Sequence, residues 1–193
     1  MIELEKKYQL FIGATRFLTD NSILDNFGNF YKYKMLKVNL NNDGLIDDFD
    51  QSLFFNSYFS KQIDEKYFLK KGDILVKLIK PIEFFLITKN MDCIFNKSFC
   101  IIRSTKDDYE NSLNLWSYLK INEKNISKKL SQQQFVSMIN LKDIKKIRIN
   151  EKSINKNLLK FFYKKSEFNN LLAKKQILLD RLFNYCKYKK EIV

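Results

Sequence analysis

The chain has 193 residues, of which 45% are hydrophobic and 18 are phenylalanine. With only four glycines and one proline, this composition supports a packed core and argues against a disordered or linker-rich chain. The formal net charge of +13 is uneven, because residues 1–120 hold 17 basic and 16 acidic side chains whereas residues 121–193 hold 18 and 6. Such an excess in one part of a chain indicates a polyanionic partner and favours nucleic acid.

The composition also excludes several classes of site. There is no histidine, which rules out Ser–His and Cys–His nucleophile systems. Cys93, Cys100 and Cys186 form no Cys-x-x-Cys pair, so we expect buried structural thiols and no zinc. No Gly-rich phosphate loop is present, and we expect neither a cofactor nor catalysis. No signal peptide and no apolar run of ~18 residues is visible, so we expect a soluble, cytoplasmic protein without a membrane segment.

Three segments of the N-terminal part carry recognisable patterns. Residues 8–18 are apolar and fit either a strand or a docking segment. Residues 30–40 alternate in a way that predicts a strand. Residues 52–60 are rich in aromatic side chains, for which we expect core packing, with base stacking by one ring as the alternative.

Residues 39–50 have two interpretations. Their Asn and Asp side chains fall at the spacing of a calcium-binding EF-hand loop, with Gly44 at its sixth position. Asn39 and Asp50 are weaker ligands than the Asp and Glu that open and close such a loop, and the flanking segments resemble strands. We therefore prefer an ordinary Asn-Asp-Gly turn and expect no metal.

The segment from residue 68 to residue 103 organises the chain. Residues 70–73 form a polar turn in which Gly72 can adopt a positive φ. Apolar, β-branched runs at 74–79, 84–88 and 99–102 then predict three buried strands. Loops of the resulting sheet are expected to present basic side chains, namely Lys77, Lys80, Lys89 and Arg103.

A helix is predicted over residues 107–120. Asp107 or Asp108 is the candidate N-cap, and Leu113, Trp116 and Leu119 follow at a spacing that places them on one face. Trp116 is interpreted as a core anchor.

Residues 122–134 form a polar run that combines lysines with Gln and Asn. Lysine can neutralise phosphates, and Gln can pair with the major-groove edge of adenine. The run is interpreted either as a DNA-reading loop or as a solvated loop in which Ser131 caps the following helix. A short turn and an alternating strand are expected at 144–149.

Residues 153–189 contain neither Pro nor Gly and predict one long helix. Phe161, Phe168 and Leu182 share one heptad position, and Leu172 and Leu179 share another. An apolar stripe of this kind needs a partner helix. The alternative is a helix that folds back on its own domain.

Several of these motifs occur in a recognisable order. Gly72-Asp73-Ile74-Leu75 is followed by a strand that ends in Ile101-Ile102-Arg103, with a strand and Gly turn upstream at 33–46 and a polar segment and strand downstream at 130–149. This order resembles the target-recognition domain of type I restriction-modification specificity subunits. The resemblance implies an α+β fold, with a mixed β-sheet domain over residues 1–152 and one long C-terminal helix over residues 153–193.

The resemblance further implies a non-catalytic module that reads double-stranded DNA for a methyltransferase or nuclease partner. A full specificity subunit has two recognition domains and two helices, so this chain would be a half-subunit. It would form a homodimer, or pair with a second half-subunit, through Phe161, Phe168, Leu172, Leu179 and Leu182. The predicted DNA-binding residues are Lys77, Lys80, Arg103, Lys128 and Lys129 for phosphates, and Gln132, Gln133 and Gln134 for base edges.

Two other classes of function stay open. An inhibitor protein that mimics a specificity subunit would bind the restriction complex and not DNA. A small Mg²⁺-dependent nuclease would need Asp50, Asp64 and Lys66 to converge in one cleft.

Overall fold

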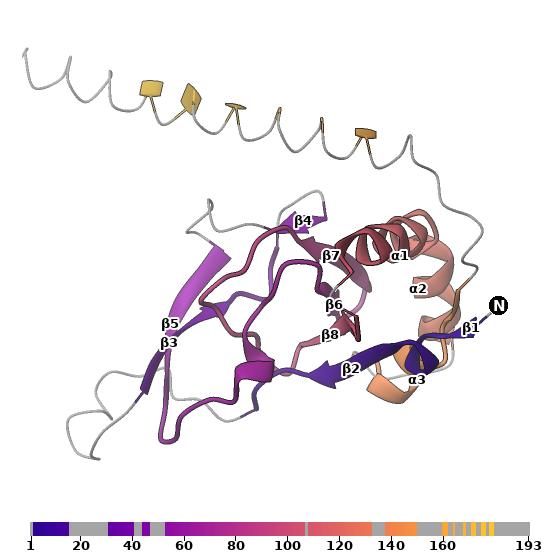
Figure 1. Ribbon diagram of the computed structural model, residues 1–193, viewed down its shortest axis with the longest axis horizontal. Coiled ribbons are helices and arrows are strands. Elements are labelled where there is room, and N and C mark those ends of the chain that lie inside the picture. Colours follow the sequence, from indigo (N-terminus) through magenta and orange to yellow (C-terminus); the bar gives the residue numbers. More distant parts are fainter. Residues whose placement is uncertain are drawn as a thin grey trace, which may run out of the picture. The chain divides into compact units, whose positions relative to one another are not determined.

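The computed structural model describes residues 2–15, 31–40, 44–46, 53–106, 108–132 and 138–149, together with ten helical positions between residues 160 and 179. Contacts between Cα atoms divide the chain into two units, Met1–Ile154 and Asn155–Val193 (Figure 1). Unit 1 combines helices with a largely antiparallel sheet, which gives the chain the expected α+β class.

A five-stranded sheet forms the centre of unit 1. Its strand order is β2-β8-β6-β7-β4, and the strands span Tyr8–Ile12, Phe99–Ser104, Ile74–Lys77, Glu83–Ile87 and Leu45–Ile46. Neighbouring strands are antiparallel except β4, which runs parallel to β7. The three strands predicted in the central segment are confirmed as β6, β7 and β8, each with ends within two residues of the prediction.

The central strands are apolar apart from polar residues at their ends, because both faces of the sheet are covered. Leu75, Phe85 and Ile101 belong to one core cluster and are at most 1% exposed. Helix α1, Tyr109–Ile121, packs against β7 and β8. The indole nitrogen of Trp116 donates a hydrogen bond of 3.3 Å to the carbonyl oxygen of Phe84, and the side chain is 1% exposed, so Trp116 is the predicted core anchor.

A second, two-stranded antiparallel sheet is formed by β3, Tyr31–Leu36, and β5, Phe54–Phe59. The β3 strand confirms the alternating pattern, whereas β5 lies in the aromatic segment, for which no strand was predicted. The expected core packing of that segment is confirmed for Phe54 and Phe59, which are 8% and 5% exposed.

Helix α1 begins as predicted. The carboxylate of Asp108 accepts a hydrogen bond of 3.1 Å from the backbone N–H of Asn111, which satisfies one of the unpaired donors of the first turn. Beyond α1 come α2, Glu123–Gln132, and α3, Leu141–Lys145.

The prediction of a loop over residues 122–134 is wrong where the chain is described, because α2 occupies most of it. The segment has no Pro or Gly and contains good helix formers, and Ile126 and Leu130 are four residues apart on one face. Ser131 lies inside α2 and does not cap the following helix, whose N-cap is Asn140.

Short elements complete unit 1. Strand β1, Ile2–Glu3, pairs antiparallel with β9, Arg148–Ile149. The strand expected at 144–149 is thus confined to its last two residues, because residues 144 and 145 belong to α3. In the described part of the chain, the 3₁₀ turns η1 and η4 span Leu4–Lys6 and Glu65–Tyr67. Among the described residues, no helix has the length and apolar character that a membrane span requires.

Unit 2 is described only at separate helical positions. The apolar side chains among them are exposed, from 37% for Leu179 to 64% for Leu171. Of the predicted pairing residues, Phe161, Phe168 and Leu172 are likewise exposed, and Leu182 lies outside the described residues.

Candidate nucleic-acid interface

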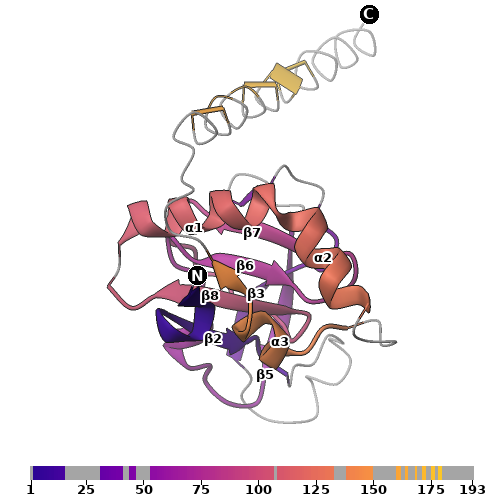
Figure 2. The ribbon, with the colours of Figure 1, turned by 90° about the vertical axis from the view of Figure 1, so that its right-hand side faces the viewer.

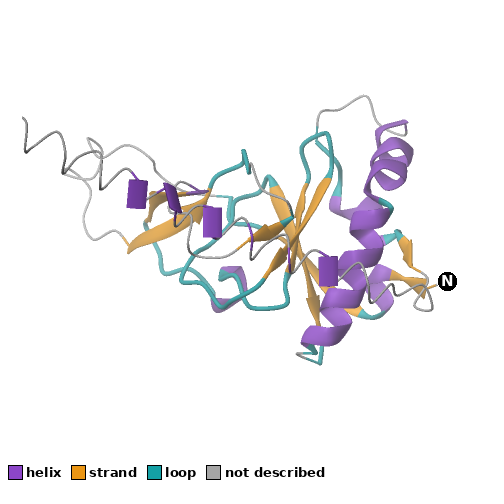
Figure 3. Cartoon of the chain, turned by 90° about the horizontal axis from the view of Figure 1, so that it is seen from above, coloured by secondary structure: helices purple, strands orange, loops and turns teal. Residues whose placement is uncertain are grey.

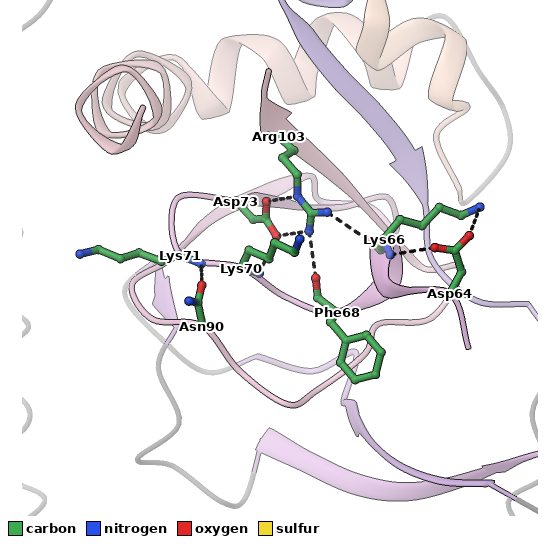
Figure 4. Close-up of polar contacts among 8 residues, drawn as sticks. All are labelled: Asp64, Lys66, Phe68, Lys70, Lys71, Asp73, Asn90 and Arg103. Carbon is green, nitrogen blue, oxygen red and sulfur yellow. Dashed lines mark hydrogen bonds and ion pairs between the residues drawn. The ribbon is translucent and has the colours of Figure 1, made fainter. Parts of the chain in front are cut away.

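Arg103, predicted to contact phosphate, lies in an internal ion pair. Its Nε and one terminal nitrogen approach the two carboxylate oxygens of Asp73 at 2.7 and 2.6 Å (Figure 4). The same terminal nitrogen donates to the carbonyl oxygen of Phe68 at 2.9 Å. Only 13% of the Arg103 side chain and 2% of the Asp73 side chain are exposed. The two ends of the organising segment, the Gly-Asp turn and the strand ending in Arg, are thus joined by one salt bridge.

The turn that carries Asp73 is shaped for this contact. Gly72 has a φ of +90°, a conformation that favours glycine. The Asp73 carboxylate also accepts a hydrogen bond of 2.7 Å from the backbone N–H of Lys70. Burial raises the pKa of Asp73 above its ordinary value, although the guanidinium of Arg103 opposes that shift. Arg103 therefore has a structural role, because most of its hydrogen-bond donors are already occupied within the chain.

Lys77 and Lys80 also have partners within the chain. The ammonium of Lys77 lies 2.7 Å from the carboxylate of Glu83, its neighbour across β6 and β7. Lys80 lies 3.5 Å from the carbonyl oxygen of Ser131 near the end of α2. The remaining predicted residues lie on or just after α2: Lys128 and Lys129 are exposed on the helix, Gln132 is its last residue, and Gln133 and Gln134 lie outside the described residues.

Helix α2 is fixed to the sheet through its polar side chains. The carboxylate of Glu123 accepts a hydrogen bond of 3.0 Å from the backbone N–H of Phe84 and pairs with the ammonium of Lys120 at 2.8 Å. The hydroxyl of Ser127 accepts one of 3.4 Å from the backbone N–H of Ile82. These contacts hold one side of α2 beside β7 (Figure 2).

A groove of about 550 Å³ lies between the end of α1, helix α2 and the α3–β9 segment. We call it the basic groove. Apolar side chains in its lining are Ile126, Leu130 and Ile147. Its polar lining consists of Tyr118, Asn122, Asn125, Lys129, Asp143, Lys146 and Arg148. Three cations against one carboxylate give the lining a formal charge of +2.

No acidic side chain in the described part of the chain neutralises the cations of the basic groove. Lys129, Lys146 and Arg148 are all exposed, and within the described part of the chain none of their side chains forms an ion pair. Glu3 is the cross-strand neighbour of Arg148 in the β1–β9 pair, yet no salt bridge joins them. Unpaired cations beside amide side chains can bind phosphate oxygens and donate to, or accept from, polar groups of a nucleic acid.

Sequence reasoning found one of these cations and missed two. Lys129 was predicted, whereas Lys146 and Arg148 were treated only as positions of an alternating strand. Residues 122–129 and 143–148 come together because α3 and β9 return beside α2, and no local pattern predicts that return. The available signal was compositional: residues 121–149 hold seven basic and two acidic side chains.

Of the residues of the alternative nuclease site, Asp64 and Lys66 are paired with each other in a turn. Asp64 is the N-cap of η4: one carboxylate oxygen accepts from the backbone N–H of Lys66, and the other lies 3.1 Å from its ammonium. These contacts lower the pKa of Asp64, the backbone hydrogen bond most of all. Asp50, and most of the segment 39–50 that was weighed as a calcium loop, lies outside the described residues. Among described side chains, no group of three His, Cys, Asp or Glu gathers as a metal site.

Two of the three thiols are described and are buried. Burial raises the pKa of Cys93 to about 12 and raises that of Cys100 as well, so both stay protonated near neutral pH. Both agree with the expectation of structural thiols, and Cys186 lies outside the described residues.

No protein-family model and no curated protein sequence matches this chain. Its candidate site therefore stands on geometry and charge alone.

Proposed function

We propose that this chain is a non-catalytic module that binds double-stranded DNA through the basic groove. The observation that carries the proposal is the convergence of Lys129, Lys146 and Arg148 on one groove without ion-pair partners among the described residues. A cation that the fold does not neutralise is available to an external anion. Phosphate contacts of this kind supply most of the affinity of a DNA-binding protein.

The lining of the groove supports a nucleic acid over a simple anion. Asn122 and Asn125 offer both donors and acceptors, and Tyr118 adds a hydroxyl that lies 3.4 Å from the carbonyl oxygen of Arg148. Its apolar lining residues could contact a sugar or a base. Sulfate or phosphate alone would use only the cations.

The finer proposal follows the resemblance to type I specificity subunits. In it, unit 1 is a target-recognition-like domain and unit 2 is one long helix that pairs through Phe161, Phe168, Leu172, Leu179 and Leu182. The exposed apolar side chains at the described positions of unit 2 support a pairing role. A methyltransferase or nuclease subunit would then perform the chemistry at the site that this module selects.

The test is binding of the purified chain to a random-sequence duplex between about 50 and 200 mM salt. Each phosphate contact contributes about 0.9 to the slope of log K against log salt. The triple variant Lys129→Ala, Lys146→Ala, Arg148→Ala should therefore bind more weakly and lose up to about 2.7 of that slope. The control is Lys142→Ala on α3, an exposed lysine outside the groove lining, which should bind as the parent does.

Two results would count against the proposal. If the parent chain fails to bind duplex DNA at the lowest salt, autonomous DNA binding is wrong, and capture of a restriction complex by the same chain would favour the inhibitor class. If the parent binds and the triple variant keeps its affinity and slope, the basic groove is not the contact surface. The mass in solution, recorded alongside, tests pairing through unit 2.

A further inference from the structure

The two-stranded sheet β3–β5 carries positive charge without any acidic residue. Residues 31–40 and 53–63 contain four lysines, Lys32, Lys34, Lys37 and Lys61, and no Asp or Glu. Residues 1–120 as a whole are nearly balanced. The lysines of these two stretches are not offset by a carboxylate within them, although the segment that joins them contains Asp43, Asp47, Asp48 and Asp50.

One face of this sheet is committed to the core. The ring of Tyr33 makes edge contacts with Phe59 and Phe68, and Met35 is fully buried in the same cluster. Cross-strand register places Tyr33 opposite Ser57 and Met35 opposite Phe55. The hydroxyl of Tyr33 also accepts a hydrogen bond of 3.1 Å from the backbone N–H of residue 63. This face therefore fixes the sheet rigidly on the rest of unit 1.

The opposite face is open at the end that contains Lys32. Side chains alternate along strands, so Lys32 and Lys34 share this face with their cross-strand partners, Tyr58 and Asn56 respectively. Both lysines and Asn56 are exposed, and Tyr58 is half-buried. The ammonium of Lys34 lies 5.4 Å from the centre of the Phe54 ring. Phe54 is buried, so this face meets the core at the end of the sheet opposite Lys32.

Three of these four side chains have no polar partner among the residues that the structure describes. Among the described residues, the side chains of Lys32, Asn56 and Tyr58 make no hydrogen bond and no ion pair. An exposed Asn on a strand interior is disfavoured by β propensity and gains nothing here from a structural contact. An external binding partner explains these exposed polar side chains more simply than a structural role does.

We propose that this open face of β3–β5 enters the major groove of double-stranded DNA and reads base edges there. A two-stranded ribbon has the width that the major groove admits, and other proteins use such ribbons to read it. Asn56 can pair with adenine through both of its amide atoms, while Lys32 can bind a guanine edge or a phosphate. This inference rests on the proposed DNA-binding function and adds a second contact surface to it.

The β3–β5 sheet, which we call the ribbon, is separate from the basic groove. In Figure 1 the β3–β5 sheet lies at one end of unit 1 and the three helices lie at the other, and Figure 3 shows the same separation from above. The two surfaces share no residue, so each can be altered without the other. A duplex of about 30 base pairs is about 100 Å long at the spacing of DNA and can span both ends of a domain of this size.

The experiment is selection from a duplex library with a random central region, performed with the parent chain and with three variants. Asn56→Ala should lose a preferred adenine and bind the parent's selected sequence roughly 5- to 150-fold more weakly. Lys32→Ala should reduce the salt slope by about 0.9 if it contacts a phosphate, or lose a preferred guanine if it contacts a base. Lys97→Ala, an exposed lysine outside both surfaces, is the control and should select the parent's sequence with the parent's affinity.

The outcomes separate this inference from the proposed function. If Asn56→Ala and Lys32→Ala select the same sequence with the affinity and salt slope of the parent, while the groove triple variant binds weakly, the ribbon is refuted and the groove stands. If the ribbon variants lose specificity and the groove variant binds as the parent does, the groove is refuted and the ribbon stands. Failure of the parent to bind any duplex overturns both. Thermal melting of each variant confirms that the exposed substitutions leave the fold intact.

Discussion

The substitution Arg103→Met gives the sharpest test of the structural role assigned to the organising segment. It removes the guanidinium that approaches both oxygens of the Asp73 carboxylate and the carbonyl oxygen of Phe68, while keeping an apolar side chain of similar reach. Asp73 is 2% exposed, so solvent cannot replace the lost partner. The variant therefore contains a buried carboxylate without its cation. Asp73 must then either stay charged in the interior or take up a proton.

The expected cost follows from burial. Removing one partner of a buried ion pair destabilises a protein by about 3–5 kcal/mol, and a natural domain has only about 5–15 kcal/mol to lose. For a domain of this length each kcal/mol lowers the melting temperature by roughly 2–4 °C, so the loss should reach roughly 6–20 °C. By contrast, an exposed control such as Lys97→Met should change stability by less than about 0.5 kcal/mol.

The loss should also depend on pH. Burial raises the pKa of Asp73, and Arg103 opposes that shift, so its removal should raise the pKa further. A carboxyl group whose pKa is higher in the folded than in the unfolded chain holds its proton more firmly when folded. Its contribution to stability is therefore present at low pH and is lost as pH rises through the folded pKa. The deficit of Arg103→Met should shrink as the pH falls from about 7 towards the ordinary carboxyl range.

Urea unfolding of the parent, of Arg103→Met and of the double variant Asp73→Leu, Arg103→Met at several pH values measures these effects. The double variant should recover more than half of the loss at neutral pH, because a buried pair can often be replaced by apolar side chains at little cost. Incomplete recovery is expected, since the backbone N–H of Lys70 loses its acceptor. A deficit below about 1 kcal/mol, or one that does not change with pH, would refute the reasoning.

Three further predictions concern the core. Gly13→Ala should cost about 1–3 kcal/mol or more by urea unfolding, because an added Cβ would lie 2.3 Å from the carbonyl oxygen of Asn96 and force the backbone to move. Trp116→Ala should cost about 3–5 kcal/mol in the same assay, since it empties a fully packed position and removes a hydrogen bond to β7. Cys93 and Cys100 should react with a thiol reagent only as fast as the protein opens, which site-resolved mass spectrometry can follow; rapid labelling near neutral pH would contradict their burial and raised pKa values.

The parts of the fold that local pattern predicts are those with dense apolar runs. Strands β6, β7 and β8 follow from continuous β-branched and aromatic residues, and α1 follows from an acidic N-cap and a helical apolar spacing. The polar turn before β6 follows from Gly72, whose positive φ is confirmed. These features are local, so a single sequence carries them.

The parts that the sequence did not reveal depend on tertiary context. The low hydrophobicity of residues 122–132 suggested a loop, but side-chain contacts from α2 to β7 and two apolar residues on one face stabilise a helix there. Strand β5 exists because it pairs with β3, and its own aromatic residues fit several environments. Arg103 was interpreted as a phosphate ligand because nothing local indicates that Asp73, thirty residues earlier, would become its partner.

Net charge illustrates the same limit and suggests how the two proposed surfaces differ in function. A balance of +1 over residues 1–120 averages the carboxylate-free ribbon with acidic segments elsewhere, so the total hides a surface that could matter for recognition. The basic groove, in contrast, gathers three cations, which suit phosphate contacts. Phosphate contacts position a protein on DNA, whereas base contacts specify the sequence.

If both surfaces bind one duplex, damage to the groove should appear as lost affinity and salt dependence for every sequence. Damage at Asn56 should appear as lost discrimination between sequences, with little change in binding to random DNA.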